Sequence, residues 1–372
     1  MTQLAAEHQP SLPDLSAVLD DIFTGAGARD AATPPVPFPE EAIAALEEAG
    51  ALCWSAIPGP ARPPAEQELA LVRRAAAADG SVGRILDGHL NAVERLAVQA
   101  PPAVRDRELA AVRDHGLRAG VWGGDPVPGE GPPAAVVQGI DGEVLRGVKT
   151  FCSGAGGLHR ALVLGRDHTR EDPAPGPVLV WVDLTDRRVE IDTGWYRSRG
   201  LAASASHRVV FHDAPVLARL GDNGAIAEQP WFGRDALRTA ASWAGMADTA
   251  VAAAAAGLRE RPGRGDLEGL AMGRILTAQR TIDVWLAAAA RAMDAAGAGG
   301  VDLAAVALHG RAGIADACRA LLDEAARACG SRPFATAGAL DRARRDLEVF
   351  LLQHRLDPLL ARAGHAALSE AD

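Results

Sequence analysis

Two short segments in the middle of the chain carry residue types suited to holding a ligand by close backbone contact. The first reads Val121-Trp-Gly-Gly-Asp, and the second reads Gly147-Val-Lys-Thr-Phe-Cys-Ser-Gly. Glycines let a ligand approach the backbone, and Asp125 and Ser153 place a carboxylate and a hydroxyl beside them. The same glycines also suit hairpin turns, so the spacing alone leaves a binding site and a pair of turns as alternatives.

The chain lacks the residue spacings that mark several other kinds of site. His159, His207 and His212 do not have metal-ligand spacing, and the four cysteines form no Cys-x-x-Cys pair, so we expect no bound metal and no disulfide framework. No Gly-x-Ser-x-Gly turn, Walker loop or Gly-x-Gly-x-x-Gly fingerprint occurs. The sequence therefore argues against serine hydrolases, P-loop enzymes and Rossmann dehydrogenases.

The elements around the two segments change from helix to strand and back to helix. From Leu12 to about Leu117, apolar residues recur at helical spacing. Short apolar runs separated by Gly and Pro then follow without an intervening helix, which favours an antiparallel β domain. After about Pro230, four long Ala-rich amphipathic stretches predict a helical bundle. The prediction is a mainly α protein with a central β domain, divided into an N-terminal helical domain (1–119), a β domain (120–225) and a C-terminal four-helix bundle (226–372).

Composition sets limits on the class of protein. The chain has 372 residues, 48% of them hydrophobic and 23% charged, which is typical of a globular protein with a sizeable core. The net charge is -10 and the arginines are scattered, so we expect no nucleic-acid partner. No apolar run is long enough to span a membrane and the N-terminus shows no signal pattern, so a cytoplasmic location is expected.

The two segments resemble the flavin-contacting segments of the acyl-CoA dehydrogenase superfamily. Those segments read roughly Thr-Glu-Pro-x-x-Gly-Ser and Gly-x-Lys-x-Trp-Ile-Thr-Asn-Gly, and Lys149, the one lysine of the chain, falls on the family's lysine. Gly200-Leu-Ala-Ala-Ser-Ala-Ser-His and Leu340-Asp-Arg-Ala-Arg-Arg-Asp resemble a strand and a bundle motif of the same family. The resemblance runs from about residue 77 to 367 and implies the acyl-CoA dehydrogenase fold.

The resemblance also implies an FAD cofactor. The contacts it implies are Trp122, Gly123, Gly124, Asp125, Phe151, Cys152, Ser153, Gln279 and Gly330. Backbone donors and the Ser153 hydroxyl would face the ring edge where reduced flavin concentrates negative charge, and Phe151 would pack flat on the ring. The family's Arg-x-x-Phe motif for the flavin diphosphate is broken in this chain.

Substrate residues follow from the same resemblance. Many members place their base eight residues after the aspartate of the Arg-Asp motif, and the count from Asp346 reaches His354, an imidazole able to accept a proton near neutral pH. A role at a helix end is the alternative for His354. Asp235 and Arg238 resemble the pair that grips the CoA adenosine in some members, and His89 is a further candidate for substrate contact.

The main prediction is α,β-dehydrogenation of an acyl thioester, with hydride transfer to flavin N5. One alternative is a two-component monooxygenase of the same fold, which would use FMN reduced by a partner reductase, because His354-Arg-Leu-Asp-Pro loosely resembles a motif of that branch. The other alternative is a non-catalytic scaffold. The expected partners are an acyl-CoA or other small molecule, an electron-transfer protein or flavin reductase, and further copies of the chain in a homodimer or homotetramer.

Overall fold

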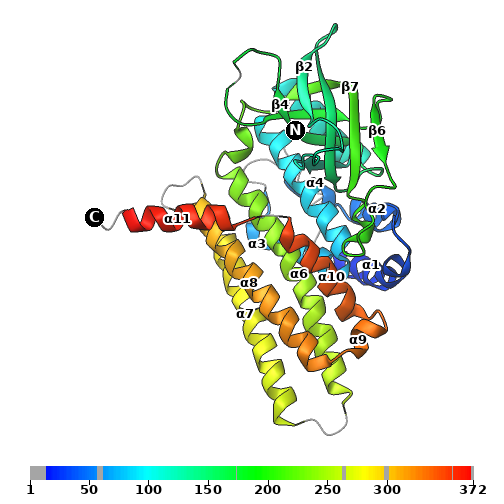
Figure 1. The fold of residues 1–372 in the computed structure, drawn as a ribbon, viewed down its shortest axis with the longest axis vertical. Coiled ribbons are helices and arrows are strands. Elements are labelled where there is room, and N and C mark those ends of the chain that lie inside the picture. The colour runs from blue at the N-terminus through cyan, green and yellow to red at the C-terminus, as the bar shows by residue number, and fades with distance from the viewer. Residues whose placement is uncertain are drawn as a thin grey trace. The chain divides into compact units, whose positions relative to one another are not determined.

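A computed structural model of the chain describes residues 14–56, 62–172, 174–261, 265–296, 301–353 and 355–369. The first part of the chain is helical: α1 (Asp14–Ala31), α2 (Glu40–Glu48), the 3-10 helix η1 (Ala51–Ala56), α3 (Ala65–Ala78), α4 (Gly80–Gln99) and α5 (Pro102–His115). Strands follow: β1 (Ala119–Trp122), β2 (Ala135–Gln138), β3 (Glu143–Cys152), β4 (Arg160–Asp167), β5 (Val178–Asp183), β6 (Val189–Asp192) and β7 (His207–Arg219). The last part is helical again: α6 (Trp231–Arg259), α7 (Asp266–Ala295), α8 (Leu303–Cys329), α9 (Arg332–Ala335), α10 (Ala339–Leu352) and α11 (Asp357–Ser369). The predicted order of helices, sheet and helices is confirmed (Figure 1).

The chain forms two compact units that cut across the predicted domain boundaries. The sheet unit comprises the described residues up to Pro63 together with Arg84–Ser198 and Ala202–Trp231, and the bundle unit comprises Pro64–Gly83, Arg199–Leu201 and the described residues from Phe232 onward. Helix α3 belongs to the bundle unit because Arg73 pairs with Asp248 of α6 and Asp283 of α7, at 2.6 and 2.8 Å. The helices that precede β1 are therefore divided between the two units.

The strands of the sheet unit close a ring in the order β4, β2, β3, β7 and β5, with β5 returning to β4. Strand β1 lies outside β4, and β6 pairs with β7. The pairs β1–β4 and β2–β4 are parallel, while the other five pairings are antiparallel. The predicted antiparallel domain is thus mixed, because β1 and β2 pair with a later strand rather than only with their neighbours in sequence.

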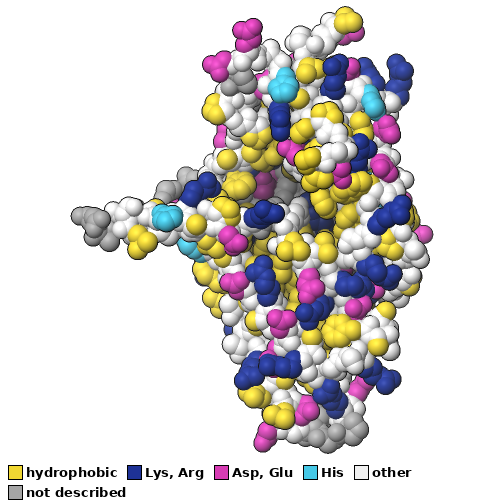
Figure 2. Space-filling view, in the orientation of Figure 1, with side chains coloured by type: hydrophobic (Ala, Val, Ile, Leu, Met, Phe, Trp, Pro, Cys, Tyr) yellow, Lys and Arg dark blue, Asp and Glu magenta, His cyan; other side chains and the backbone are white. Residues whose placement is uncertain are grey.

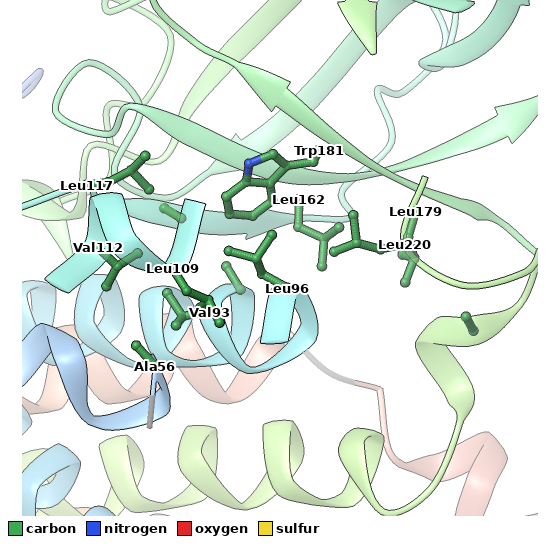
Figure 3. Close-up of a cluster of buried hydrophobic side chains, with 13 residues drawn as sticks. Ala56, Val93, Leu96, Leu109, Val112, Leu117, Leu162, Leu179, Trp181 and Leu220 are labelled. Carbon is green, nitrogen blue, oxygen red and sulfur yellow. The ribbon is translucent and has the colours of Figure 1, made fainter. Parts of the chain in front are cut away.

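Helices α4 and α5 cover one face of this sheet (Figure 3). Val93 and Leu96 of α4 and Leu109 of α5 lie in one apolar cluster with Leu162 of β4 and Trp181 of β5. The Trp181 indole N–H donates to the Glu108 carboxylate at 3.0 Å, so its polar atom is satisfied within the core. Burying one such side chain contributes about 1.5 to 3 kcal/mol, which fixes the strands that carry the site.

In the bundle unit, α7 and α8 lie side by side along most of their length (Figure 1). The Trp243 ring of α6 meets Phe350 of α10 edge to face, with centroids 6.2 Å apart. Helix α11 has no buried residue, and Figure 2 shows apolar side chains exposed along it. Within the described ranges, no helix combines the length and hydropathy of a bilayer span.

Candidate functional site

The structure brings the two predicted segments together at the end of β1. The Trp122 indole N–H donates to the Ser153 carbonyl at 3.0 Å, and Thr150 N–H donates to the Gly124 carbonyl at 2.9 Å. A Cβ atom on Gly124 would lie 2.5 Å from the Thr150 carbonyl oxygen, so only glycine permits this approach. Both segments belong to the sheet unit, where these hydrogen bonds hold them against each other.

Lys149 holds the first segment in place through two hydrogen bonds. Its ammonium group donates to the Asp125 carboxylate at 2.7 Å and to the Gly123 carbonyl at 3.2 Å. The lysine side chain is only 3% exposed, whereas the Asp125 side chain is 50% exposed. Because the ammonium group of Lys149 already binds this segment, we assign it a positioning role rather than a ligand contact.

Among the described residues, two backbone N–H groups of the first segment have no hydrogen-bond acceptor. The Thr150 hydroxyl donates to the Asp125 carbonyl at 3.1 Å, and Lys149 occupies the Asp125 carboxylate. In the part of the chain that the structure describes, the N–H groups of Gly124 and Asp125 donate to no protein acceptor. They are available to a ligand that presents acceptor atoms.

Three serine hydroxyls form a chain that ends at the second segment. Ser153 Oγ lies 2.9 Å from Ser206 Oγ, which lies 2.8 Å from Ser204 Oγ. Ser204 is fully buried and Ser206 nearly so, while Ser153 is half-buried. Three hydroxyl protons serve two internal bonds, so one proton must point elsewhere. We assign it to Ser153, with Ser204 donating to Ser206 and Ser206 donating to Ser153, because the other arrangements would leave a buried proton on Ser204 or Ser206 without an acceptor.

Ser204 and Ser206 were not singled out in the sequence. Their spacing gave no signal, because Ser204 ends a 3-10 helix (Ala202–Ser204) and Ala205 has a left-handed backbone, so the two serines do not follow the alternation of an extended strand. Ser204 and Ser206 flank Ala205 just before β7, whose first residue, His207, pairs with Cys152. That register places the two hydroxyls beside Ser153.

Backbone strain is concentrated at the same place. Phe151 and Ala205 have φ angles of 53° and 46°, in the left-handed region that costs a residue with a Cβ roughly 1 to 2 kcal/mol. The register of β3 against β7 is also irregular between Lys149 and Cys152, and such bulges re-aim side chains. Phe151 is 58% exposed, and its ring meets Trp195 edge to face, with the centroids 5.0 Å apart. An exposed aromatic side chain therefore lies two residues before Ser153.

Replacement of Phe151 by glycine and by alanine should separate this strain from the loss of the ring. Both variants remove the ring, but only glycine relieves the left-handed backbone, so Phe151→Gly should be more stable than Phe151→Ala by about 1 kcal/mol. Urea unfolding measures the difference. An alanine variant equal to or more stable than the glycine variant would show that the backbone is not strained.

A cavity of about 540 Å³ opens beside the first segment within the sheet unit. Its lining includes Gly123, Asp125 and Lys149 together with Arg166, His168 and the loop Pro175–Pro177. This volume is within the range of small-molecule sites. Cys152 contributes no side chain to such a site, because it is fully buried and burial raises the pKa of its thiol well above the usual value.

His89 does not meet the prediction of substrate contact. It lies fully buried on α4, where Nδ1 accepts from Ala119 N–H at 3.1 Å and Nε2 lies 2.9 Å from the Leu52 carbonyl. A neutral imidazole protonated on Nε2 satisfies both contacts, and no nitrogen remains for a ligand. The structure therefore corrects the predicted role: His89 joins α4 to η1 and β1.

Burial lowers the pKa of His89 from 6.5 to about 4, so its contribution to stability depends on pH. The unfolded chain binds the proton more readily, so the contribution is fully present above about pH 6.5 and is lost as the pH falls toward 4. The expected loss across that window is about 3 kcal/mol. Urea unfolding at pH 7, 5.5 and 4 should show it, and the loss should shrink in His89→Gln. The exposed His115→Gln variant is the control; a dependence in His89→Gln as steep as in the wild type would contradict the assignment.

Arg238 is also placed differently from the prediction. Within the bundle unit it is fully buried on α6, and its guanidinium pairs with the Glu68 carboxylate of α3. Arg234 binds the second oxygen of Glu68 at 3.1 Å, and Asp235 lies 3.5 Å from Arg238. The guanidinium cannot reach a nucleotide from this position, so the structure corrects the predicted CoA contact.

Gln279 and Gly330 belong to the bundle unit, whereas the other predicted flavin residues belong to the sheet unit. The Gln279 amide donates to Asp248 at 2.8 Å, on the carboxylate that Arg73 also binds. Gly330 ends α8 with a φ of 72°, which explains the glycine without a ligand. Their flavin contacts stay predictions. His354 lies outside the described residues, two positions beyond the end of α10.

No metal cluster accompanies the site: the described residues include no group of three or more His, Cys, Asp or Glu side chains placed to hold a metal ion. No family model matches the chain, and no curated protein matches it significantly by sequence.

Solved structures do match over almost the whole chain. FMN-bound TdsC from Paenibacillus sp. A11-2, a dibenzothiophene monooxygenase, has a TM-score of 0.82 at 17% identity and covers 96% of this chain and 97% of its own. Methanesulfinate monooxygenase MsuC from Pseudomonas fluorescens has a TM-score of 0.79 at 20% identity, with 97% of each chain covered. Butyryl-CoA dehydrogenase from Megasphaera elsdenii has a TM-score of 0.81 at 16% identity, covering 96% and 97%. The chain therefore has the acyl-CoA dehydrogenase fold, as the sequence motifs predicted.

Proposed function

We propose that this protein binds a flavin on the sheet unit and oxygenates a small organic substrate, using reduced flavin from a partner reductase. The observation that carries the proposal is the chain of serine hydroxyls that ends at the half-buried Ser153, two residues after the exposed Phe151, in the unit that also contains the N–H groups of Gly124 and Asp125 without a protein acceptor among the described residues. The fold shared with TdsC and MsuC supports the same class of chemistry.

The residues present suit a flavin ring. Reduced flavin concentrates negative charge along its pyrimidine edge and N5, where O–H and N–H donors stabilise it. The aromatic face of Phe151 suits the flat surface of the ring, because offset stacking is favourable. When bound, the reduced flavin would supply the electrons that activate dioxygen.

The protein's own part in this chemistry is to position donors and hold protons. Lys149 keeps the segment 123–125 against β3. Ser204 and Ser206 orient the Ser153 hydroxyl, so its proton is held ready at Oγ on the ligand side. Trp122 ties the Ser153 backbone to β1. Because each group is fixed before the ligand arrives, little reorganisation is needed on binding.

The buried Arg238 favours oxygenation over dehydrogenation of an acyl-CoA. The CoA adenosine contact that the motif suggested is absent from the described bundle, since Glu68 occupies the guanidinium. The proposed substrate is therefore a small molecule without a CoA carrier. FMN is the proposed flavin, in keeping with the FMN-bound TdsC neighbour and with the broken diphosphate motif.

Dehydrogenation with FAD remains the second candidate, supported by the similarity to butyryl-CoA dehydrogenase at a TM-score of 0.81. In that reaction His354 would take the Cα proton, and an electron-transfer protein would reoxidise the flavin. Gln279 and Gly330 would contribute to the FAD site.

A homodimer or homotetramer is part of the proposal. Helix α7 exposes Leu276 and Val284 at about half of their surface or more, next to a shallow pocket lined by Thr277, Arg280 and Trp285. Helix α11 exposes Leu368 and buries nothing. Exposed apolar faces of this kind commonly mark contacts between subunits.

One experiment distinguishes the two reactions. The protein loaded with oxidised flavin is mixed anaerobically with a panel of acyl-CoAs, and the flavin absorption band is followed; separately, reduced FMN and air are supplied with sulfinates and heteroaromatic compounds, and oxygenated products are measured. We expect no bleaching by acyl-CoA and product formation with one of the second set. Bleaching by an acyl-CoA, without oxygenated product, would establish the dehydrogenase instead.

A further inference from the structure

The cavity beside the first segment lies where the pairing of β4 with β5 ends. That ladder runs as far as Gly165 opposite Val178, and β4 then continues against β2, with Ala135 opposite Arg166. The residues that lead into β5, Ala174–Pro177, line the cavity instead of pairing with β4. The cavity, of about 540 Å³, is therefore a consequence of the strand register.

Hydrogen bonds hold this part of the cavity wall in place. The Asn223 amide donates to the Ala174 carbonyl at 3.2 Å, and Gly224 N–H donates to the Pro177 carbonyl at 2.8 Å. Gly176 has a φ of 96°, and a Cβ atom on it would lie 2.7 Å from Gly224 Cα, so this position requires glycine. The wall is thus fixed by contacts within the sheet unit before any ligand arrives.

Two basic side chains at the end of β4, Arg166 and His168, line the cavity. Side chains two residues apart on a strand share a face, and both residues are exposed while Asp167 between them is buried. His168 N–H donates to the Val136 carbonyl at 2.9 Å, so the extended pairing continues one residue past β4. The two basic side chains therefore leave the strand on the same face, from Cα atoms roughly 6.6 Å apart.

The other charges of the lining are already paired. Lys149 binds Asp125 at 2.7 Å, and the Asp167 carboxylate accepts from the Arg219 guanidinium at 2.8 and 3.2 Å. Within the described ranges, neither of the two basic side chains at the end of β4 forms an ion pair or a hydrogen bond with the protein. The described lining therefore keeps one uncompensated positive charge, that of Arg166, with an imidazole beside it.

An anion would balance the charge of this cavity. We propose that Arg166 and His168 bind the oxyanion group of a ligand there, either the carboxylate of a small organic acid or the phosphate of FMN. The planar guanidinium offers two parallel donors to such a group, and an imidazole N–H offers another. Leu164, Pro175 and Pro177 give the same cavity an apolar wall that suits the body of a small molecule.

The two sources differ in their dependence on flavin. An organic acid would bind without it, whereas the phosphate source rests on the proposed function. The first experiment therefore titrates the purified protein, without added flavin, with benzoate and with its neutral isostere benzamide, by calorimetry in a sodium chloride background that screens general charge effects. If an organic acid is the ligand, benzoate should bind with a millimolar dissociation constant and benzamide at least tenfold more weakly.

Variants of Arg166 test the assignment of the site. Arg166→Met should weaken binding of the oxyanion at least tenfold, and Arg166→Lys should weaken it less, since it keeps the charge but loses the fork. Arg170→Met is the matched control, because Arg170 is an exposed arginine of the same loop that does not line the cavity. Since Arg166 is exposed, these changes should shift the thermal unfolding midpoint by no more than about two degrees.

Fluorescence titrations with FMN and with riboflavin identify the source of the oxyanion. If the phosphate of FMN binds here, FMN should bind at least tenfold more tightly than riboflavin, and the ratio should fall toward one in Arg166→Met. Benzoate should then compete with FMN. If an organic acid binds here, the FMN-to-riboflavin ratio should be the same in both proteins, and benzoate should still bind in the presence of FMN.

Two results would overturn the site. One is a wild-type protein that prefers neither benzoate over benzamide nor FMN over riboflavin. The other is an Arg166→Met variant with the same affinities as the wild type. Benzoate binding that depends on Arg166, together with no binding of flavin, would refute the proposed flavin function and support the oxyanion site, so the two failures are distinguishable.

Discussion

Replacing Arg238 by alanine is expected to destabilise the protein by about 3 to 5 kcal/mol. Arg238 is fully buried and pairs with Glu68, so its removal breaks a buried ion pair and takes one cationic partner from a buried carboxylate. Glu68→Gln should have a comparable effect, because both arginines lose their carboxylate. Urea unfolding followed by circular dichroism measures the change.

Arg259→Ala, at the exposed end of the same helix, is the control and should change stability by less than about 0.5 kcal/mol. If Arg238 instead grips a CoA adenosine, Arg238→Ala should weaken acyl-CoA binding while stability is preserved. That result would restore the dehydrogenase interpretation and contradict the structural role that the buried pair indicates.

Replacing Ser153 by alanine is expected to weaken binding of reduced flavin about tenfold and of oxidised flavin much less. In the assigned direction the Ser153 hydroxyl offers its proton to the ligand, and a hydrogen bond to a charged acceptor is worth more than one to a neutral acceptor. A tenfold difference, about 1.4 kcal/mol, lowers the two-electron midpoint potential of the bound flavin by about 30 mV. Redox titration against a reference dye measures this shift without any substrate.

Ser204→Ala tests the direction of the hydroxyl chain. In the assigned direction Ser204 only donates to Ser206, so its removal should leave the Ser153 proton in place and the potential nearly unchanged. Thr185→Val, which removes a hydroxyl bound to Asp183 elsewhere in the sheet unit, is the control. A larger shift in Ser204→Ala than in Ser153→Ala would reverse the assigned direction.

The sequence predicted the fold and the two segments of the site because both are encoded locally. Helical periodicity, Gly and Pro breaks, and the glycines around Asp125 and Ser153 can be read within a few residues. Partners that are distant in the sequence could not be read in this way. Glu68 meets Arg238 only when α3 joins the bundle, and Ser206 meets Ser153 only through the register of β7 on β3.

The burial of individual side chains could not be predicted from the sequence either. A histidine on a predicted helix looks equally suited to a ligand or to the core, and only the contacts of His89 with Leu52 and Ala119 decide between them. The burial of Arg311 on α8, which is 5% exposed, could not be predicted from the sequence, because an arginine on an amphipathic helix is normally solvated. Its enclosure beside Trp243 follows from the packing of three helices.

Flavin binding is tested most directly by titrating the purified protein with FMN and with FAD and following the quenching of flavin fluorescence. We expect saturable binding of one flavin per chain with a dissociation constant of order micromolar, which corresponds to a binding free energy of about 8 kcal/mol. We also expect Phe151→Ala to weaken binding and Arg259→Ala, at an exposed position, to leave it unchanged. Absence of binding of either flavin, oxidised or reduced, up to about a hundred times that concentration would contradict flavin binding by this protein.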